Sequence, residues 1–127
     1  MEDIAFLNVD LDLESGEDLS LLIDDFGDSV IVMNNIFEGD IYKVSIELAG
    51  LQGDSGYLFR EYFKLLDNMS AQAKCLWDRC SKKKFDLGFQ SGAEPMGITE
   101  NIPLEVISKL SEYGASVAIT VYAVCPS

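Results

Sequence analysis

The chain of 127 residues contains no histidine, only nine basic side chains and only three cysteines. Without histidine it lacks the usual general base for serine and cysteine nucleophiles, and also the commonest transition-metal ligand. Cys75, Cys80 and Cys125 lack Cys-x-x-Cys spacing, so we expect reduced thiols rather than a zinc site or a disulfide framework. We therefore expect no cofactor, no metal ion and no enzymatic activity.

The chain also lacks any apolar run approaching the ~18 residues of a membrane span, and its first residues show no basic region of the kind that opens a secretory signal. We accordingly expect a cytoplasmic protein that does not associate with membranes. Hydrophobic residues make up 48% of the chain and charged residues 24%, which is close to the globular average. This composition and length predict a single folded domain over residues 1–127.

Basic residues are almost missing from the first half of the chain. Residues 1–54 hold fourteen Asp or Glu and a single base, Lys43, whereas residues 55–127 hold eight acids and eight bases. The whole net charge of −13 therefore belongs to the first 54 residues. Such asymmetry favours an electronegative surface and a basic partner, and it argues against direct binding to nucleic acid.

The acidic half begins with an alternating pattern over residues 5–13, which predicts a strand whose inner face carries Leu7, Val9, Leu11 and Leu13. Its outer face should carry Asn8, Asp10 and Asp12, with Glu14 continuing the acidic side. A Ser-x-x-Asp capping signal at Ser15 precedes apolar residues at helical spacing, so we expect an amphipathic helix over 16–26. Two strands, 30–37 and 41–49, should form a hairpin around Gly39.

The second half is expected to contain the main helix, over 57–81, either continuous or broken near 68–70, with Ser55 as its N-cap. A strand at 85–89, a helix at 104–113 beginning after Pro103, and a strand at 117–124 that is apolar on both faces should follow. The order β-α-β-β-α-β-α-β predicts an α+β fold, a mainly antiparallel sheet with helices on one face. We expect the last strand to be central.

The acidic residues of the first strand and first helix, with one apolar residue among them, are the candidate partner-binding site. They are Asp10, Asp12, Glu14, Glu17, Leu21, Asp24, Asp25 and Asp28. The helix dipole stabilises carboxylates in the first turn of a helix, which accounts for Glu17 but not for the other acids of this set. The alternative is a solvated acidic surface with no partner.

Other chemistry has less support in the sequence. The segment 10–16 superficially resembles a calcium loop, but Ser15 and Leu21 occupy the positions where that loop needs Gly and Glu. A DNA-mimic inhibitor would need carboxylates spaced like phosphates over a long surface. A small-ligand site or enzyme pocket beside Trp77 is a third option, although aromatic residues at helical spacing usually form the core.

The stretch 84–122 carries a strand, a Pro-initiated helix closing on Leu110-Ser-Glu-Tyr-Gly114, and a strand ending in Val121-Tyr122. In these features it resembles small bacterial domains of the immunity-protein type, found beside polymorphic toxins such as those of contact-dependent growth inhibition. The resemblance implies an immunity protein that binds and neutralises a cognate toxin domain with a basic surface, such as a nuclease. It assigns no binding residue, because the acidic half lies outside it.

Overall fold

The computed structural model describes residues 4–92 and 97–123, which form one five-stranded sheet and a layer of helices. The elements are β1 (Ala5–Ser15), α1 (Ser20–Phe26), the 3-10 helix η1 (Gly27–Ser29), β2 (Val30–Glu38), β3 (Ile41–Leu48), α2 (Ser55–Asp67), α3 (Ala71–Asp78), β4 (Lys82–Gln90), α4 (Leu104–Tyr113) and β5 (Ser116–Tyr122). The strand order is β2-β3-β1-β4-β5, and only the pair β4 and β5 is parallel. The predicted α+β class with a mainly antiparallel sheet is confirmed.

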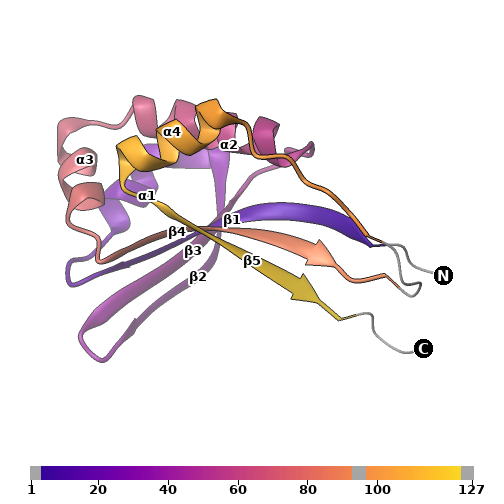
Figure 1. Cartoon of the computed structure of the whole chain (residues 1–127). Coiled ribbons are helices and arrows are strands. Elements are labelled where there is room, and N and C mark those ends of the chain that lie inside the picture. The colour runs from indigo at the N-terminus through magenta and orange to yellow at the C-terminus, as the bar shows by residue number, and fades with distance from the viewer. Residues whose placement is uncertain (1–3, 93–96, 124–127) are drawn as a thin grey trace.

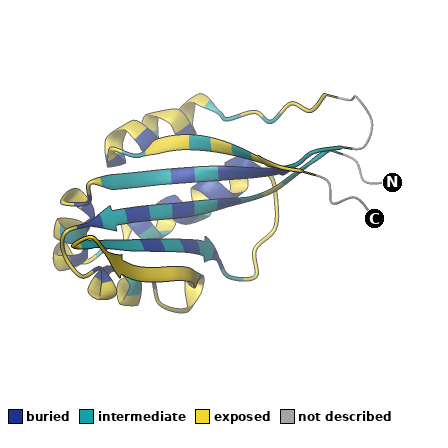
Figure 2. Ribbon diagram, turned by 90° about the horizontal axis from the view of Figure 1, so that it is seen from below, coloured by how far each residue is buried: buried dark blue, intermediate teal, exposed yellow. Residues whose placement is uncertain are grey.

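The helices cover one face of the sheet, and the other face is open (Figure 1). Alternate residues of the three central strands point into the helix layer, among them Leu11, Ile46 and Phe85, which are fully buried. Figure 2, which views the sheet from below, shows the two outer strands mostly exposed and the three central strands buried or intermediate. The core therefore lies between the helices and β3, β1 and β4.

Tyr62 ties α2 to the centre of this sheet. Its hydroxyl donates to the carbonyl oxygen of Val9 at 2.8 Å, and its ring packs edge-on against Phe85, with 5.1 Å between the ring centroids. Phe59 contacts the same ring at 5.3 Å. Burying such aromatic side chains stabilises the fold by about 1.5–3 kcal/mol each. The expected role of the helical aromatics as core residues is confirmed.

Of the two alternatives for the long helix, continuous or broken near 68–70, the structure shows the broken one, because α2 ends at Asp67 and α3 begins at Ala71. Ser70 caps α3 by accepting from the backbone N–H of Ala73 at 3.1 Å. The predicted cap of α2 was wrong by one residue: Asp54 accepts from Tyr57 N at 2.8 Å, while buried Ser55 donates to the carbonyl of Asn101. A carboxylate is the stronger acceptor for an unsatisfied helix N–H.

The first helix is shorter than predicted, since it begins at Ser20 rather than at 16. Ser15 still belongs to β1, and its hydroxyl accepts from the N–H of Glu17 in a local turn. Oδ1 of Asp18 then accepts hydrogen bonds from the backbone N–H and the hydroxyl of Ser20, at 2.8 and 2.5 Å. Side-chain hydrogen bonds of this kind compete with the helix and delay its start.

Two predictions about strand faces were wrong. The register of β1 shifts between Phe6 and Asn8, so Leu7 sits in a bulge with 49% of its surface exposed instead of joining the core. The last strand, β5, lies at an edge of the sheet rather than at its centre, and Ile119 is 65% exposed.

In the described part of the chain, none of the helices combines the length and the apolar character that crossing a membrane requires.

Candidate functional site

Three carboxylates stand in one line across the open face of the sheet. Asp10 of β1 lies directly opposite Glu47 of β3 on one side and directly opposite Asp86 of β4 on the other. We call Glu47, Asp10 and Asp86 the acidic row. Directly opposed side chains on neighbouring strands lie about 4.5–5.5 Å apart at their Cβ atoms, and like charges there destabilise the sheet. The row therefore lowers the stability of the central strands of the sheet through electrostatic repulsion.

Burial and neighbouring charge both act on Asp10. Partial burial, followed by repulsion from Glu47, Asp12 and Asp86, raises the pKa of the Asp10 carboxyl from 3.8 to about 6. The side-chain amide of Asn8 partly compensates, donating to Oδ1 of Asp10 at 3.1 Å and to Oε2 of Glu47 at 3.3 Å. The hydroxyl of Thr120 donates to both oxygens of Asp86, at 2.8 and 2.9 Å.

The next acids along β1 are matched by lysines of β4. Lys84 Nζ lies 3.6 Å from Asp12 Oδ2, and Lys82 Nζ lies 3.0 Å from Glu14 Oε2. Within residues 4–92 and 97–123, by contrast, no Lys or Arg forms an ion pair with a member of the acidic row. The row is thus the part of the open face whose negative charge has no protein counter-charge.

The acids of α1 lie elsewhere. α1 packs against α3 in the helix layer, with Leu22 and Phe26 buried, so its outer surface faces away from the open side of the sheet (Figure 1). Leu21, Asp24 and Asp28 are exposed there, and Asp25 accepts from the N–H of Ser70 at 3.1 Å. We call Leu21, Asp24, Asp25 and Asp28 the α1 patch.

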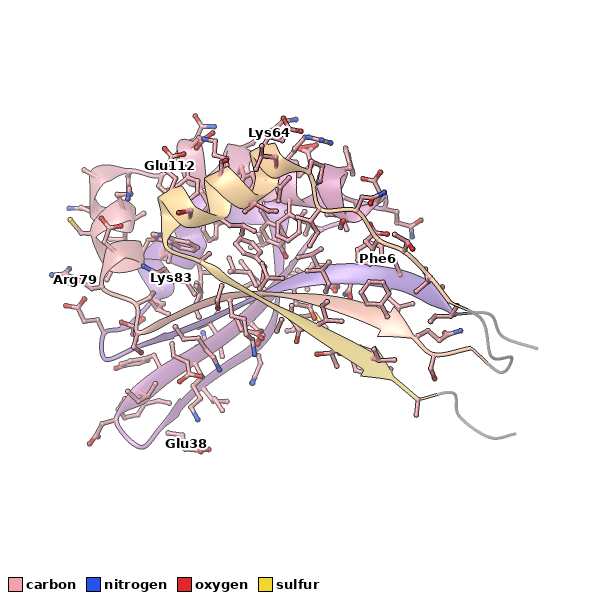
Figure 3. The ribbon with its side chains drawn as sticks, viewed as in Figure 1. Phe6, Glu38, Lys64, Arg79, Lys83 and Glu112 are labelled. Carbon is pink, nitrogen blue, oxygen red and sulfur yellow. The ribbon has the colours of Figure 1, made fainter. Side chains whose placement is uncertain are left out.

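Glu17 lies before α1 and pairs with Arg79 at 3.0 Å; Arg79 is labelled at one end of the molecule in Figure 3. The structure thus places the eight predicted site residues in separate regions. Asp10, Asp12 and Glu14 do line the open face as expected, and the α1 patch lies on the helix layer. Glu17 belongs to an ion pair with Arg79, the residue directly after α3.

Sequence reasoning missed Glu47 and Asp86 as members of the site. Each is separated from Asp10 by more than thirty residues, and only the pairing of β3 and β4 with β1 brings them together. The outward position of Glu47, between inward Ile46 and Leu48, was the signal available for it. The site also adjoins apolar side chains of β2 on the open face. Ile31 stands opposite Glu47 and Ile36 opposite Lys43, and 45% and 40% of their respective surfaces are exposed.

The remaining candidate groups offer little chemistry. Burial raises the pKa of the Cys80 thiol to about 11, which keeps it in the unreactive neutral form, while Cys75 is exposed. Cys125 lies outside the described residues. Trp77 is fully buried, and its indole N–H donates to the carbonyl of Tyr113 at 3.0 Å. Among the residues that the structure describes, no group of three or more His, Cys, Asp or Glu side chains is arranged to hold a metal ion.

The open face can therefore attract and hold cationic groups, with apolar side chains of β2 alongside them.

Searches of protein-family models, of curated proteins and of solved structures find no match to this chain.

Proposed function

We propose that this protein is a stoichiometric inhibitor of the immunity-protein kind, which binds a cognate basic toxin domain through the open face of its sheet. The observation that carries the proposal is the acidic row, three carboxylates that form no ion pair with a described Lys or Arg and that lie on the face of the sheet opposite the helix layer. Like charges opposed on adjacent strands destabilise the isolated sheet, and a basic partner that neutralises them would remove this cost.

Electrostatics supports a basic partner. The isolated protein has to keep like charges opposed on adjacent strands, and the pKa of Asp10 is raised first by partial burial and then by repulsion from Glu47, Asp12 and Asp86. Arg or Lys side chains of a partner would convert the repulsion into attraction at the moment of binding. The net charge of −13 would also accelerate encounter with a basic domain at low ionic strength.

The resemblance of residues 84–122 to immunity-type domains supports the class of partner. A DNA-mimic inhibitor has less support, because Asp12 and Glu14 beside the row are paired with lysines and the α1 patch lies on another side of the molecule. A small-ligand site beside Trp77 has less support as well, since that side chain is fully buried in the core.

The test is co-expression with the C-terminal domain of the protein encoded immediately upstream, followed by purification of any complex and measurement of association rates across salt concentrations. We expect a 1:1 complex whose association rate falls as salt rises. If that domain is not toxin-like, or if it is toxin-like and neither binds nor is inhibited, the proposal is overturned.

Two matched triple variants locate the interface. Asp10→Asn/Glu47→Gln/Asp86→Asn neutralises the acidic row, and Asp24→Asn/Asp25→Asn/Asp28→Asn neutralises the α1 patch, so each removes three charges. Both should slow association equally if net charge alone matters. We expect only the row variant to increase the dissociation rate, because only its carboxylates would be desolvated against the partner. Faster dissociation in the α1 variant alone would assign the interface to the helix layer.

A further inference from the structure

A small cavity opens where the acidic row meets the end of the sheet. It measures about 300 Å³ and lies between β1, β2, β3 and the loop that leads from β3 to α2. This is the lower limit of pockets that hold free small molecules, so its size suits a single side chain better than a whole ligand. Its lining residues are Leu7, Asn8, Val9, Ile31, Glu47, Leu48, Gly50, Leu51, Gln52 and Leu58.

The cavity has apolar walls at its mouth. Leu7, Ile31 and Leu51 come from three segments far apart in the sequence, and 49%, 45% and 37% of their respective surfaces are exposed. Leu7 reaches this position only because of the bulge in β1. Half-exposed apolar side chains that converge on one hollow gain from contact with the aliphatic part of an incoming group.

The cavity has one charged group, Glu47. Asn8 donates to its Oε2 atom at 3.3 Å and thereby orients the carboxylate. Its Oε1 atom has no hydrogen-bond partner among the residues described, and no base of that part of the chain pairs with Glu47. A hollow lined by apolar side chains together with an oriented carboxylate that has a free oxygen matches a side chain with an aliphatic stem and a cationic end.

We propose that this cavity is a socket for one arginine side chain of a protein partner, with the stem packed on Leu7, Ile31 and Leu51 and the guanidinium on Glu47. Arginine fits better than lysine because the guanidinium is planar and weakly hydrated, so it loses less on entering a site with apolar walls. Asp10, held by the same Asn8 amide, adds a second acidic group one strand away. The inference deepens the proposed function, since it names one contact of that interface.

The test uses an arginine derivative rather than the partner, so that its failure is distinguishable from failure of the proposed function. N-acetyl-arginine methylamide is titrated at low salt into the full-length protein labelled with ¹⁵N, and amide shifts are followed. We expect saturable shifts confined to the lining residues, with a dissociation constant in the millimolar range. The neutral analogue N-acetyl-citrulline methylamide should produce no such shifts, and the lysine derivative should bind more weakly.

Two variants and one control complete the test. Glu47→Gln should weaken binding of the arginine derivative about fivefold, the upper range for a solvent-accessible ion pair. Leu51→Ala, in an exposed loop where the fold tolerates change, should weaken binding through lost contact with the stem. Glu38→Gln, at the hairpin tip labelled in Figure 3, removes the same charge far from the cavity and should leave binding unchanged. Unlocalised shifts, equal binding of citrulline or lysine, or wild-type affinity in Glu47→Gln would overturn the socket.

Discussion

Asp10 and Glu47 occupy directly opposed positions on β1 and β3, and one amide, that of Asn8, donates to both of their carboxylates. A single neutral donor reduces the repulsion between two anions but supplies no counter-charge. The pair therefore stores an unfavourable interaction in the native state that the unfolded chain does not have.

Replacing Asp10 should consequently stabilise the protein at neutral pH. Because the pKa of the folded state, about 6, exceeds the unfolded value of 3.8, the folded protein binds a proton more readily, and Asp10 makes the free energy of unfolding rise as pH falls from about 7 to 4.5. Asp10→Asn should raise the free energy of unfolding at pH 7 by about 1–2 kcal/mol, after discounting for solvent screening, and should flatten this pH dependence.

Urea unfolding at several pH values measures this effect. The exposed α1-patch residue Asp28 provides the control, since Asp28→Asn removes the same charge without touching the acidic row. The lowered pKa of Asp18, caused by its hydrogen bonds to Ser20, adds stability that is constant in this window and is lost only as pH falls below the usual range of a carboxyl. An Asp10→Asn protein that keeps the wild-type pH slope would contradict the origin assigned to the shift.

Lys84 should reduce the electrostatic repulsion among the acids on the open face of the sheet. It lies 3.6 Å from Asp12, itself one of the acids that repel Asp10. Lys84→Met should lower the free energy of unfolding by about 1 kcal/mol at low salt, and about 0.5 M NaCl should shrink the loss by screening the acids. Lys74→Met is the control, because it breaks an exposed pair with Asp78 within α3 and should cost about 0.3–0.5 kcal/mol. Equal losses in both variants would remove any special role for Lys84.

Tyr62→Phe tests the bond between α2 and the sheet. The substitution leaves the ring in the core but removes the hydroxyl that donates to the carbonyl of Val9, so the free energy of unfolding should fall by about 1–1.5 kcal/mol. Tyr57→Phe, on the exposed side of the same helix, should change it by less than about 0.5 kcal/mol. Thermal and urea denaturation of the two variants side by side would show the difference, and no loss in Tyr62→Phe would count against this bond.

Ser70→Ala tests the break between α2 and α3. Loss of the cap on Ala73 N–H should cost about 1 kcal/mol, and Ser70→Asn should restore most of it because asparagine caps equally well. The readout is the free energy of unfolding measured in urea. If Ser70→Asn were as unstable as Ser70→Ala, the cap would not be the cause.

The local elements were largely predictable, because hydrophobic period and turn residues are local signals. The hairpin at Gly39 and the helical character on both sides of 68–70 follow from them, although the pattern left open whether the long helix breaks there. The position of β5 did not, since a strand that is apolar on both faces is typical of a sheet centre. In the structure, β5 pairs with the core strand β4. Its residues Ile119 and Val121 nevertheless stay exposed, and they border a cavity that Ile98 and Ile102 also line.

The site was predictable only in part. Alternation correctly placed Asp10, Asp12 and Glu14 on an outward face of a strand. Which of them would be neutralised depended on Lys82 and Lys84, about seventy residues later, and on the antiparallel register that sets them opposite Glu14 and Asp12. Long-range pairing, which no local pattern encodes, thus decided which charges remain free.

The central place of β1 also shapes how the chain must fold. β1 pairs with β3 within the first half, but its second edge is completed only by β4, which begins at Lys82. Contacts between such distant segments raise the contact order, so we expect slower folding than in a helical protein of this size. During synthesis, a nascent chain that ends before Lys82 would present β1 with one bare edge, and this interval is when aggregation is most to be expected.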